Sequence, residues 1–468
     1  MTKIKFGTDG WRAIIAKEFT VENVARVAEA TAKWLKSQEA SPSVVVGHDC
    51  RFAGELFAET TTAALILQGV KVYLAKGFVS TPMVSMGAIS YKASLGVVIT
   101  ASHNPPDYNG FKLKGSYGGP LLPDKIEEIE NIIPDVADQA YTKVDLKKAE
   151  ADGLLVYVDL EDDYCKRVEE SFDLDAIRNS NLEFAYDAMF GAGQNVIRRL
   201  LPDTTLLHCD YNPSFEGQAP EPIAKNLTEF SEMIKISGDI DCGLATDGDA
   251  DRIGLFDNEG KFVDSHHIIL LLVHYLKKYK GMDGKVCTAF SSTVKVKTIC
   301  DHYGLELDVV KIGFKYIAGI MITDDVLLGG EESGGIAIKG HIPERDGIWM
   351  GLVIWEFMAK SGKTLQELID EVYEITGAFS VDRNDLHLAE SEKQRVINLC
   401  KTGEVKSIGS RPVIRVEDMD GFKFFVTENE WLMVRPSGTE PLLRVYAEAP
   451  THEGVMKLIG DARAQFGI

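Results

Sequence analysis

The sequence predicts an α/β protein built from three similar mixed α/β units, followed by a smaller α+β unit. Short β-branched runs alternate with amphipathic helical stretches, and continuous apolar strands in such a pattern are typical of parallel sheets covered on both faces. The pattern restarts twice along the chain and then changes character. We therefore predict four domains, over residues 1–150, 151–255, 256–374 and 375–468.

The first unit is expected to place a polar loop at the end of a buried strand. A strand at Ser43–Gly47 precedes a helix from Glu55 to Gln68, and a second strand follows at Val70–Leu74. The apolar run Leu95–Thr100 predicts a third strand, directly followed by a long polar loop. Ligands of open α/β sheets bind beyond the carboxyl ends of the strands, so this loop is a candidate for function.

Two further units repeat this pattern. A strand at Leu182–Asp187 is followed by a glycine-rich turn and a helix through Arg199. Strands at Leu206–Cys209 and Cys242–Ala245 continue this second unit, and an acidic loop follows the latter. The third unit begins near Gly260. It is expected to contain one helix and three strands, at Ser265–Tyr279, Lys285–Ala289, Leu307–Val310 and Val326–Gly329.

The chain beyond Thr376 has the character of a mixed α+β domain. The expected strands are Phe379–Leu388, Val413–Arg415, Gly421–Val426, Trp431–Arg435 and Leu442–Ala447, and the expected closing helix is Glu453–Phe466.

Composition excludes several classes of function. The 468 residues carry a formal net charge of −21, which disfavours general binding to nucleic acid or to anionic membranes. An acidic substrate must therefore be held by locally placed cations. Seven scattered cysteines without a CxxC pair indicate buried, reduced thiols. Met1–Gly10 has no signal-peptide core, and the apolar run Ile268–Leu276 is too short to span a bilayer, so we expect a cytoplasmic protein.

Three aspartates alternate in the acidic loop of the second unit: Asp247, Asp249 and Asp251. At ~5 Å, each pair of like charges costs on the order of 3 kcal/mol at an effective dielectric of ~20. A hard divalent cation removes this cost, and three protein oxygens leave positions open for a phosphate, which suits Mg²⁺. The loop therefore predicts a metal site, with a solvated acidic turn as the alternative.

The loop Thr100–Lys114 offers a second set of functional groups. Ser102 lies at the turn beside His103, and Lys112 follows later in the segment. A serine alone is a weak nucleophile that needs a base or a metal, and the acidic triad could supply the metal. A proline-stiffened loop with ordinary polar residues is the alternative. A Ser-His-Asp hydrolase is disfavoured because the chain has no GxSxG elbow.

Four other loops contain glycine together with polar groups. Gly329–Gly335 offers carboxylates and a hydroxyl, which suit a sugar, whereas Arg435–Pro441 offers an arginine, hydroxyls and free N–H groups, which suit a phosphate. Gly7–Arg12 contributes an arginine and Gly313–Lys315 a lysine. Each of these segments, taken alone, is also compatible with an ordinary turn.

Taken together, these segments resemble the α-D-phosphohexomutase superfamily of phosphoglucomutase and phosphomannomutase enzymes. The matching segments are FGTDGWR, TASHNPPDYNGFKLK, DGDADR, GFKYI, GGEESGG and RPSGTEP, in the order of that superfamily from Phe6 to Pro441. The resemblance covers nearly the whole chain. It implies four domains around a central active-site cleft, of which the first three share one topology.

The resemblance also implies roles for particular residues. Ser102 would carry a phosphoryl group and, with the three aspartates, would hold one Mg²⁺ ion. Arg12 and Lys112 would flank the transferring group, with Lys112 or His103 moving the proton. Arg252 would lie beside the phosphoserine. The residues implied for the substrate are Gly313 and Lys315 for choosing the sugar, Glu331 and Ser333 for its hydroxyls, and Arg435, Ser437, Gly438 and Thr439 for the phosphate that does not react.

The implied activity is reversible phosphoryl transfer between the 1- and 6-positions of a hexose phosphate. The phosphoserine gives a hexose 1,6-bisphosphate intermediate, which also acts as primer. We predict glucose 1-phosphate and glucose 6-phosphate as the substrates. The alternatives are a phosphomannomutase or dual-specificity mutase and then a glucosamine-phosphate mutase. A metal-dependent phosphomonoesterase and a non-catalytic sugar-phosphate-binding protein are rivals of other classes. The expected partners are small hexose phosphates, and the expected state is a monomer or homodimer.

Overall fold

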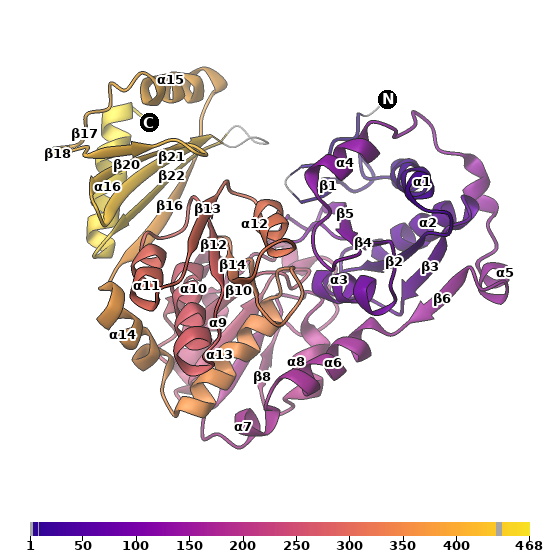
Figure 1. The fold of residues 1–468 in the computed structure, drawn as a ribbon, viewed down its shortest axis with the longest axis horizontal. Helices are drawn as coiled ribbons and strands as arrows, with labels where there is room; N and C mark the ends of the chain where they lie inside the picture. Colours follow the sequence, from indigo (N-terminus) through magenta and orange to yellow (C-terminus); the bar gives the residue numbers. More distant parts are fainter. Residues whose placement is uncertain (1–2, 8, 437–441) are drawn as a thin grey trace.

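The computed structural model describes residues 3–7, 9–436 and 442–468. Four domains form a heart-shaped molecule (Figure 1). Domain I, at the N-terminal end, and domain IV, at the C-terminal end, stand at opposite upper sides, and domains II and III lie below them. This confirms the predicted α/β fold class with a distinct C-terminal domain; the residue numbers at which we divided the chain stay predictions.

Domain I is built on a six-stranded sheet in the order β1-β5-β4-β2-β3-β6. Strands β2, β3, β4 and β6 are parallel, whereas β5 runs antiparallel to both β4 and β1. The strands are β1 (Trp11–Ile14), β2 (Ser43–His48), β3 (Lys71–Ala75), β4 (Leu95–Ile99), β5 (Tyr108–Gly115) and β6 (Leu155–Val158). The helices are α1 (Val21–Gln38), α2 (Gly54–Leu67), α3 (Thr81–Ser90), α4 (Pro123–Glu130) and α5 (Leu146–Ala151).

Helices cover both faces of this sheet, as the apolar strands predict. Val44 and Val46 of β2 belong to a core with residues of α1 and α2, whereas Val45 between them belongs to the core that includes α3. Consecutive strand residues point to opposite faces, so both faces of β2 are buried. Local capping supports the helices: Thr20 accepts a hydrogen bond from the backbone N–H of Asn23 at the start of α1.

Domain II is a five-stranded sheet in the order β11-β10-β9-β7-β8. Its strands are β7 (Phe184–Asp187), β8 (Thr205–Leu207), β9 (Cys242–Thr246), β10 (Ile253–Asp257) and β11 (Phe262–Val263). The helices of this region are α6 (Leu160–Ser171), α7 (Leu174–Arg178), α8 (Gln194–Leu200) and α9 (Thr228–Ser237).

Domain III is a four-stranded sheet in the order β13-β12-β14-β15. Its strands are β12 (Lys285–Ala289), β13 (Leu307–Val310), β14 (Val326–Gly330) and β15 (Ile336–Ile338). The helices are α10 (Ser265–His274), α11 (Lys295–Tyr303), α12 (Phe314–Met321), α13 (Gly347–Ser361) and α14 (Leu365–Thr376).

The first three sheets share one topology. In each, three parallel strands lie in the order second-first-third along the chain, and a fourth strand runs antiparallel beside the third. The corresponding sets are β3-β2-β4-β5, β8-β7-β9-β10 and β13-β12-β14-β15. The turns between third and fourth strands are residues 100–107, 247–252 and 331–335. These turns contain the serine, aspartate and glutamate motifs, so three chemically different loops occupy one topological position.

Domain IV is an antiparallel sheet in the order β16-β22-β21-β20-β19 with two helices. The strands are β16 (Ser380–His387), β19 (Arg415–Glu417), β20 (Phe422–Thr427), β21 (Glu430–Pro436) and β22 (Leu442–Ala449). The helices are α15 (Glu390–Lys401) and α16 (His452–Phe466), and β17 (Ser407–Ile408) pairs with β18 (Arg411–Pro412) beside them. Val396, Leu432, Leu443 and Leu458 are among the residues of its separate core.

Domains I to III share one large core in addition to smaller cores of their own. One buried cluster contains Val45 of domain I, Tyr186 of domain II and Trp355 of α13. Helix α13 packs on β9 and β10, and the Trp355 ring stacks on Phe184 of β7 at 4.6 Å between centroids. A helix that follows the strands of domain III in the chain therefore covers the sheet of domain II.

Three expected elements differ from those observed. The loop expected up to Lys114 becomes strand β5 at Tyr108, which pairs antiparallel with β4 and β1 and buries Lys112 and Lys114 against carboxylates. The strand expected at Val413–Arg415 is displaced to β19, since the backbone N–H of Val413 donates to Lys406 instead. Helix α10 ends at His274, and a π-helical turn over Tyr275–Tyr279 follows it.

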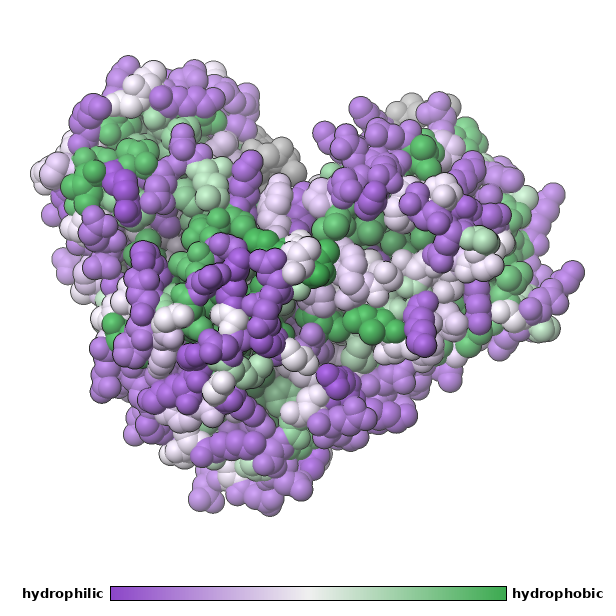
Figure 2. Space-filling view, in the orientation of Figure 1, coloured by the Kyte–Doolittle hydropathy of each residue, from purple (hydrophilic) through white to green (hydrophobic). Residues whose placement is uncertain are grey.

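Hydrophilic side chains dominate the face of the molecule seen in Figure 2. Within the described ranges, no helix combines the length and apolarity needed to cross a membrane. All seven cysteines are buried free thiols, as predicted.

Candidate active site

A cavity of about 560 Å³ lies between the four domains, and residues of all four line it. Figure 2 shows the molecular surface hollowed between its two upper lobes. The cationic side chains that line the cavity are Lys5, Arg12, Arg252, Lys315, Arg345, Arg383, Arg435 and Arg444. The acidic ones are Asp9, Glu221, Glu331 and Glu332. The cavity is therefore locally cationic within an acidic chain, which suits an anionic ligand.

Ser102 lies in the turn after β4 and is 1% exposed. Its backbone is left-handed, with φ of 53°, a conformation that costs energy for a residue with a Cβ atom. The hydroxyl Oγ donates a hydrogen bond to Oδ2 of Asp247 at 2.6 Å, and Nδ1 of His103 lies 3.5 Å from the same oxygen. The geometry thus joins the serine loop of domain I to the acidic loop of domain II.

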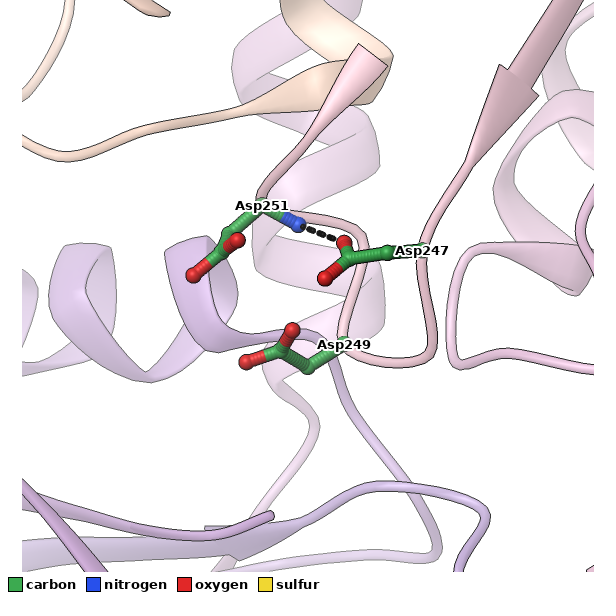
Figure 3. A group of neighbouring side chains, drawn as sticks. All are labelled: Asp247, Asp249 and Asp251. Carbon is green, nitrogen blue, oxygen red and sulfur yellow. Dashed lines mark hydrogen bonds between the residues drawn. The ribbon is translucent and has the colours of Figure 1, made fainter. Parts of the chain in front are cut away.

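The acidic loop folds its three aspartates around one space. Asp247, Asp249 and Asp251 are fully buried, and ligand oxygens from the three lie within 4.8 Å of one another. Figure 3 shows the three carboxylates on one side of the loop, with the backbone N–H of Asp251 donating to Oδ1 of Asp247. The second oxygens of Asp249 and Asp251 are buried and have no hydrogen-bond partner among the residues that the structure describes. Such orphaned carboxylate oxygens fit the ligand set of a hard divalent cation.

The electrostatics of the loop support the same conclusion. Burial, together with the charges of Asp249 and Asp251, raises the pKa of Asp247 well above its usual range. Lys112 lies 2.8 Å from Asp249 and 3.1 Å from Asp251, and Arg345 lies 2.7 Å from Asp251. Lys112 and Arg345 thus balance part of the acidic charge. The raised pKa of Asp247 indicates that negative charge remains uncompensated in the loop, which favours the binding of a further cation.

The two candidate groups for proton transfer are in opposite states. Burial lowers the pKa of Lys112, but the surrounding carboxylates of Asp249, Asp251 and Asp9 outweigh it and raise this pKa above its usual value. Burial also lowers the pKa of His103, which lies well below its usual value. The neighbouring cations, of which Arg252 contributes most, lower this pKa further. Near neutral pH, Lys112 is therefore a charged group and His103 a neutral imidazole that can accept a proton.

Domain III contributes its sugar-loop candidates to the same cavity. The backbone N–H of Gly313 donates to Oε1 of Glu331 at 2.9 Å, and Lys315 and Ser333 line the cavity beside them. Burial raises the pKa of Glu331 to about 7. A carboxyl group that is partly protonated near neutral pH can both donate and accept hydrogen bonds, which suits a ligand with hydroxyl groups.

Domain IV presents arginines to the cavity from neighbouring strands. Arg435 on β21 lies directly opposite Arg444 on β22, and Arg383 on β16 also lines the cavity. Arg435 is held by Asp420, whose Oδ1 lies 3.1 Å from Nε. Like charges opposite each other repel, so an anion between them is favourable. The other predicted phosphate ligands, Ser437, Gly438 and Thr439, lie outside the described residues.

The remaining predicted residues also meet here. Arg12 donates to Oδ1 of Asn104 at 2.7 Å, next to the serine turn. The backbone N–H of Arg252 donates to Asp247 at 3.0 Å, and its guanidinium lies 3.4 Å from Glu221. The structure therefore brings every described candidate of the sequence analysis to one cavity, to the serine and acidic loops or, for Lys112, to strand β5 beside the acidic loop.

Several residues of the site were missed by the sequence analysis. Asp9 pairs with Lys112 at 2.9 Å, and Arg345 bonds to both Asp9 and Asp251. Asp9 lies within a quoted motif, so its charge was an available signal, whereas no motif marks Arg345. Arg51 follows strand β2, so the expectation that functional residues lie beyond the carboxyl ends of strands could have identified it. It donates hydrogen bonds to backbone carbonyls of the serine loop.

Models of one protein family match nearly the whole chain. Residues 3–140, 162–260 and 264–375 match the alpha/beta/alpha domains I, II and III of phosphoglucomutase/phosphomannomutase, and residues 392–465 match its C-terminal domain. The matches follow one another in the order of the sheets described above.

Similar proteins agree with this over nearly their full lengths. A protein of Thermococcus kodakarensis named phosphoglucomutase/phosphomannomutase is 29% identical over 455 residues, covering 96% of this chain and 95% of its own. A phosphoglucosamine mutase of Streptococcus gordonii is 31% identical over 477 residues, covering 99% of both chains. The crystal structure of a protein from Thermus thermophilus, described as a putative phosphomannomutase, superposes with a TM-score of 0.87 at 32% identity over 100% of both chains. Sequence motifs, domain order and fold thus agree that this chain belongs to the phosphoglucomutase/phosphomannomutase family, within the α-D-phosphohexomutase superfamily of phosphomutases.

Proposed function

We propose that the protein moves a phosphoryl group between the 1- and 6-positions of a hexose phosphate, with Ser102 as the phosphoryl carrier. The observation that supports this most directly is the 2.6 Å contact between Oγ of Ser102 and Asp247, at the base of a cationic cavity. A carrier needs its nucleophilic oxygen next to a charge-neutralising centre, since phosphoryl transfer depends mainly on positioning and electrostatics.

Asp247, Asp249 and Asp251 are proposed to hold Mg²⁺ with an oxygen of the phosphorylated serine. When bound, the ion neutralises charge on the transferring phosphoryl oxygens. Side chains of this protein are proposed to stabilise the remaining charge and to accept the proton. Lys112 and Arg12 flank the transferring group as fixed cations, and neutral His103, 3.5 Å from the serine oxygen, is the better placed proton acceptor of the two candidates.

Domains III and IV are proposed to hold the sugar and its distal phosphate. Glu331 and Ser333 would contact hydroxyl groups, Gly313 and Lys315 would select the orientation, and Arg435 would bind the phosphate that does not react. Transfer to the sugar gives a hexose 1,6-bisphosphate, which must turn over before it returns a phosphoryl group to Ser102. The distal site must therefore accept the intermediate in two orientations, and an added 1,6-bisphosphate can prime the enzyme.

The proposed sugar is glucosamine, with glucose and mannose as the second candidates. The sequence motifs favoured glucose, but the relative from Streptococcus gordonii and a further relative from Levilactobacillus brevis, 30% identical over 99% of both chains, are named phosphoglucosamine mutases. The names of the Thermococcus and Thermus proteins support glucose or mannose instead. The choice therefore rests on relatives and requires a direct comparison of substrates.

The test is a coupled assay with Mg²⁺ and a sugar 1,6-bisphosphate primer on the 1-phosphates of glucosamine, glucose, mannose and N-acetylglucosamine. We expect isomerisation, with the highest kcat/KM for glucosamine 1-phosphate. A higher value for glucose or mannose would reverse the sugar assignment. Release of inorganic phosphate without isomerisation would indicate a phosphatase, and binding without turnover of any sugar would contradict catalysis.

A further inference from the structure

The loop that carries Ser102 is held from the side opposite the cavity. Its left-handed φ of 53° is unfavourable for serine, so surrounding contacts must maintain it. Those contacts come from the segment after β2, which contains Asp49 and Arg51. Both residues are at most 1% exposed, and neither lines the central cavity.

The guanidinium of Arg51 binds the serine loop by hydrogen bonds to the backbone carbonyls of the loop. Nη2 donates to the carbonyl oxygens of Ser102 at 2.7 Å and Asn104 at 2.6 Å. Nη1 donates to the carbonyl oxygens of Pro105 at 2.8 Å and Tyr108 at 3.0 Å. One planar guanidinium thus fixes four carbonyls between the end of β4 and the start of β5.

Asp49 and Thr100 complete the support. Oγ1 of Thr100 donates to Oδ2 of Asp49 at 2.5 Å and accepts a hydrogen bond from the backbone N–H of Ser102 at 2.9 Å. Oδ2 of Asp49 also lies 3.4 Å from Nε of Arg51. The N–H and the C=O of Ser102 are therefore both anchored to one buried Asp–Arg pair.

Domain II contributes a further contact to Arg51, from the ring of Phe215. The ring of Phe215 is 2% exposed and lies 5.1 Å from the Arg51 guanidinium carbon, as in a cation–π contact. Since Phe215 packs on the guanidinium, the fork of Arg51 has little freedom to turn away from the carbonyls. The aim of the Ser102 hydroxyl toward Asp247 thus depends on residues of both domains.

We propose that Arg51 is a positioning residue for phosphoryl transfer, which sets the orientation of the Ser102 hydroxyl through the backbone of its loop. The proposal rests on the proposed role of Ser102 as phosphoryl carrier. Within the described contacts Arg51 touches neither the hydroxyl nor the cavity, so its effect on the orientation of the reacting oxygen passes through the backbone of the loop. A lysine cannot replace it fully, because an ammonium group has three donors and no planar fork to span four carbonyls.

The test compares Arg51→Lys and Arg51→Met with wild type in the full-length chain. A displacement of about 1 Å can cost on the order of 100-fold in rate, so we expect kcat to fall about 100-fold in Arg51→Met and about tenfold in Arg51→Lys. KM for the hexose phosphate should change less than about threefold, because domains III and IV bind it. The rate at which a 1,6-bisphosphate phosphorylates Ser102, followed by mass spectrometry, should fall in parallel with kcat.

Arg26→Lys is the matched control. Arg26 is also a buried arginine of domain I that donates to a backbone carbonyl, that of Pro134, but it is on α1 and contacts no residue of the serine turn in any described hydrogen bond. This control should lose thermal stability while its kcat stays within about twofold of wild type. An equal loss of kcat in Arg26→Lys would show that the effect is general destabilisation and would overturn the proposal.

Thr100→Val keeps the test decisive if the Arg51 variants do not fold. This near-isosteric change removes the hydroxyl between Asp49 and the Ser102 N–H, and we expect about a tenfold loss of kcat with little change in KM. Wild-type kcat in Thr100→Val, or in a folded Arg51→Met, would refute the inference. If the wild-type enzyme itself neither turns over hexose phosphates nor forms phosphoserine, the proposed function fails first, so the two failures are distinguishable.

Discussion

The serine turn of domain I and the acidic turn of domain II occupy the same place in sheets of the same topology. Both follow the third parallel strand, and both contain a non-glycine residue with left-handed backbone, Ser102 with φ of 53° and Ala250 with φ of 56°. They differ in the charge that surrounds them. The serine turn is supported by the guanidinium of Arg51, whereas the acidic turn gathers three buried carboxylates.

This difference shows how one scaffold position can supply either half of a reaction centre. In the proposed reaction, the hydroxyl of the cationically supported turn would be the nucleophile, and the carboxylates opposite would hold the cation for the group that it receives. The contact between Ser102 and Asp247 joins the two halves. Changes to each turn should therefore have separable effects, which the following variants measure from the largest effect to the smallest.

Removing the nucleophile should have the largest effect. Ser102→Ala eliminates the oxygen that we propose carries the phosphoryl group, so mutase activity should fall on the order of 10⁴-fold. Hexose-phosphate binding, measured by calorimetry, should change little. Ser85→Ala, which alters another buried serine of domain I, is the control and should keep most of the activity. Turnover near the wild-type rate in Ser102→Ala would exclude this serine as the carrier.

Weakening the acidic turn should have the next largest effect. Asp249→Asn removes a charge whose second oxygen has no partner in the described contacts, so the Mg²⁺ concentration for half-maximal activity should rise about 10- to 100-fold. Asp257→Asn, a buried aspartate of β10 outside the triad, is the control. An equal Mg²⁺ requirement in both variants would contradict the assignment of the cation site.

The third equivalent turn, residues 331–335 of domain III, should respond to pH. Burial raises the pKa of Glu331 to about 7, so the folded state favours the protonated acid. Its contribution to stability is full below its ordinary pKa of 4.5 and is lost as pH rises through about 7. Glu331→Gln should remove up to ~3 kcal/mol of this loss between about pH 5 and pH 8, measured by urea unfolding. An unchanged pH dependence in the variant would show that Glu331 does not titrate there.

The smallest effect concerns how that turn docks on domain II. Gly334 has φ of 89°, and a Cβ atom there would lie 2.6 Å from the carbonyl oxygen of Ile253. Gly334→Ala should destabilise the protein by ~2 kcal/mol, from backbone strain together with the clash. Gly340→Ala is a matched control, because Gly340 has φ of 92° and open space around its missing Cβ. Equal losses of Tm in both variants would mean that the docking contact contributes nothing.

The sequence predicted the parts of the site that are local in the chain. Ser102 and the three aspartates follow apolar strands directly, so their place beyond the carboxyl ends of strands and the motifs were sufficient to find them. Arg345 and Arg51 act through contacts with segments far away in the sequence, and no local pattern reports such contacts. Strand β5 was missed for a related reason: Lys112 and Lys114 look like loop residues until their buried carboxylate partners are known.

The position of α13 has a consequence for how the molecule can be divided. Because this helix covers β9 and β10, a fragment ending after β11 would expose the apolar face of domain II to water. The repeated topology suggests modules that could be separated, yet this helix of domain III covers the sheet of domain II, so we expect those two domains to unfold together. Domain IV has its own core, but Trp431 and Tyr446 of its sheet also form a buried cluster with Phe290 of domain III, so its removal would expose that cluster to water.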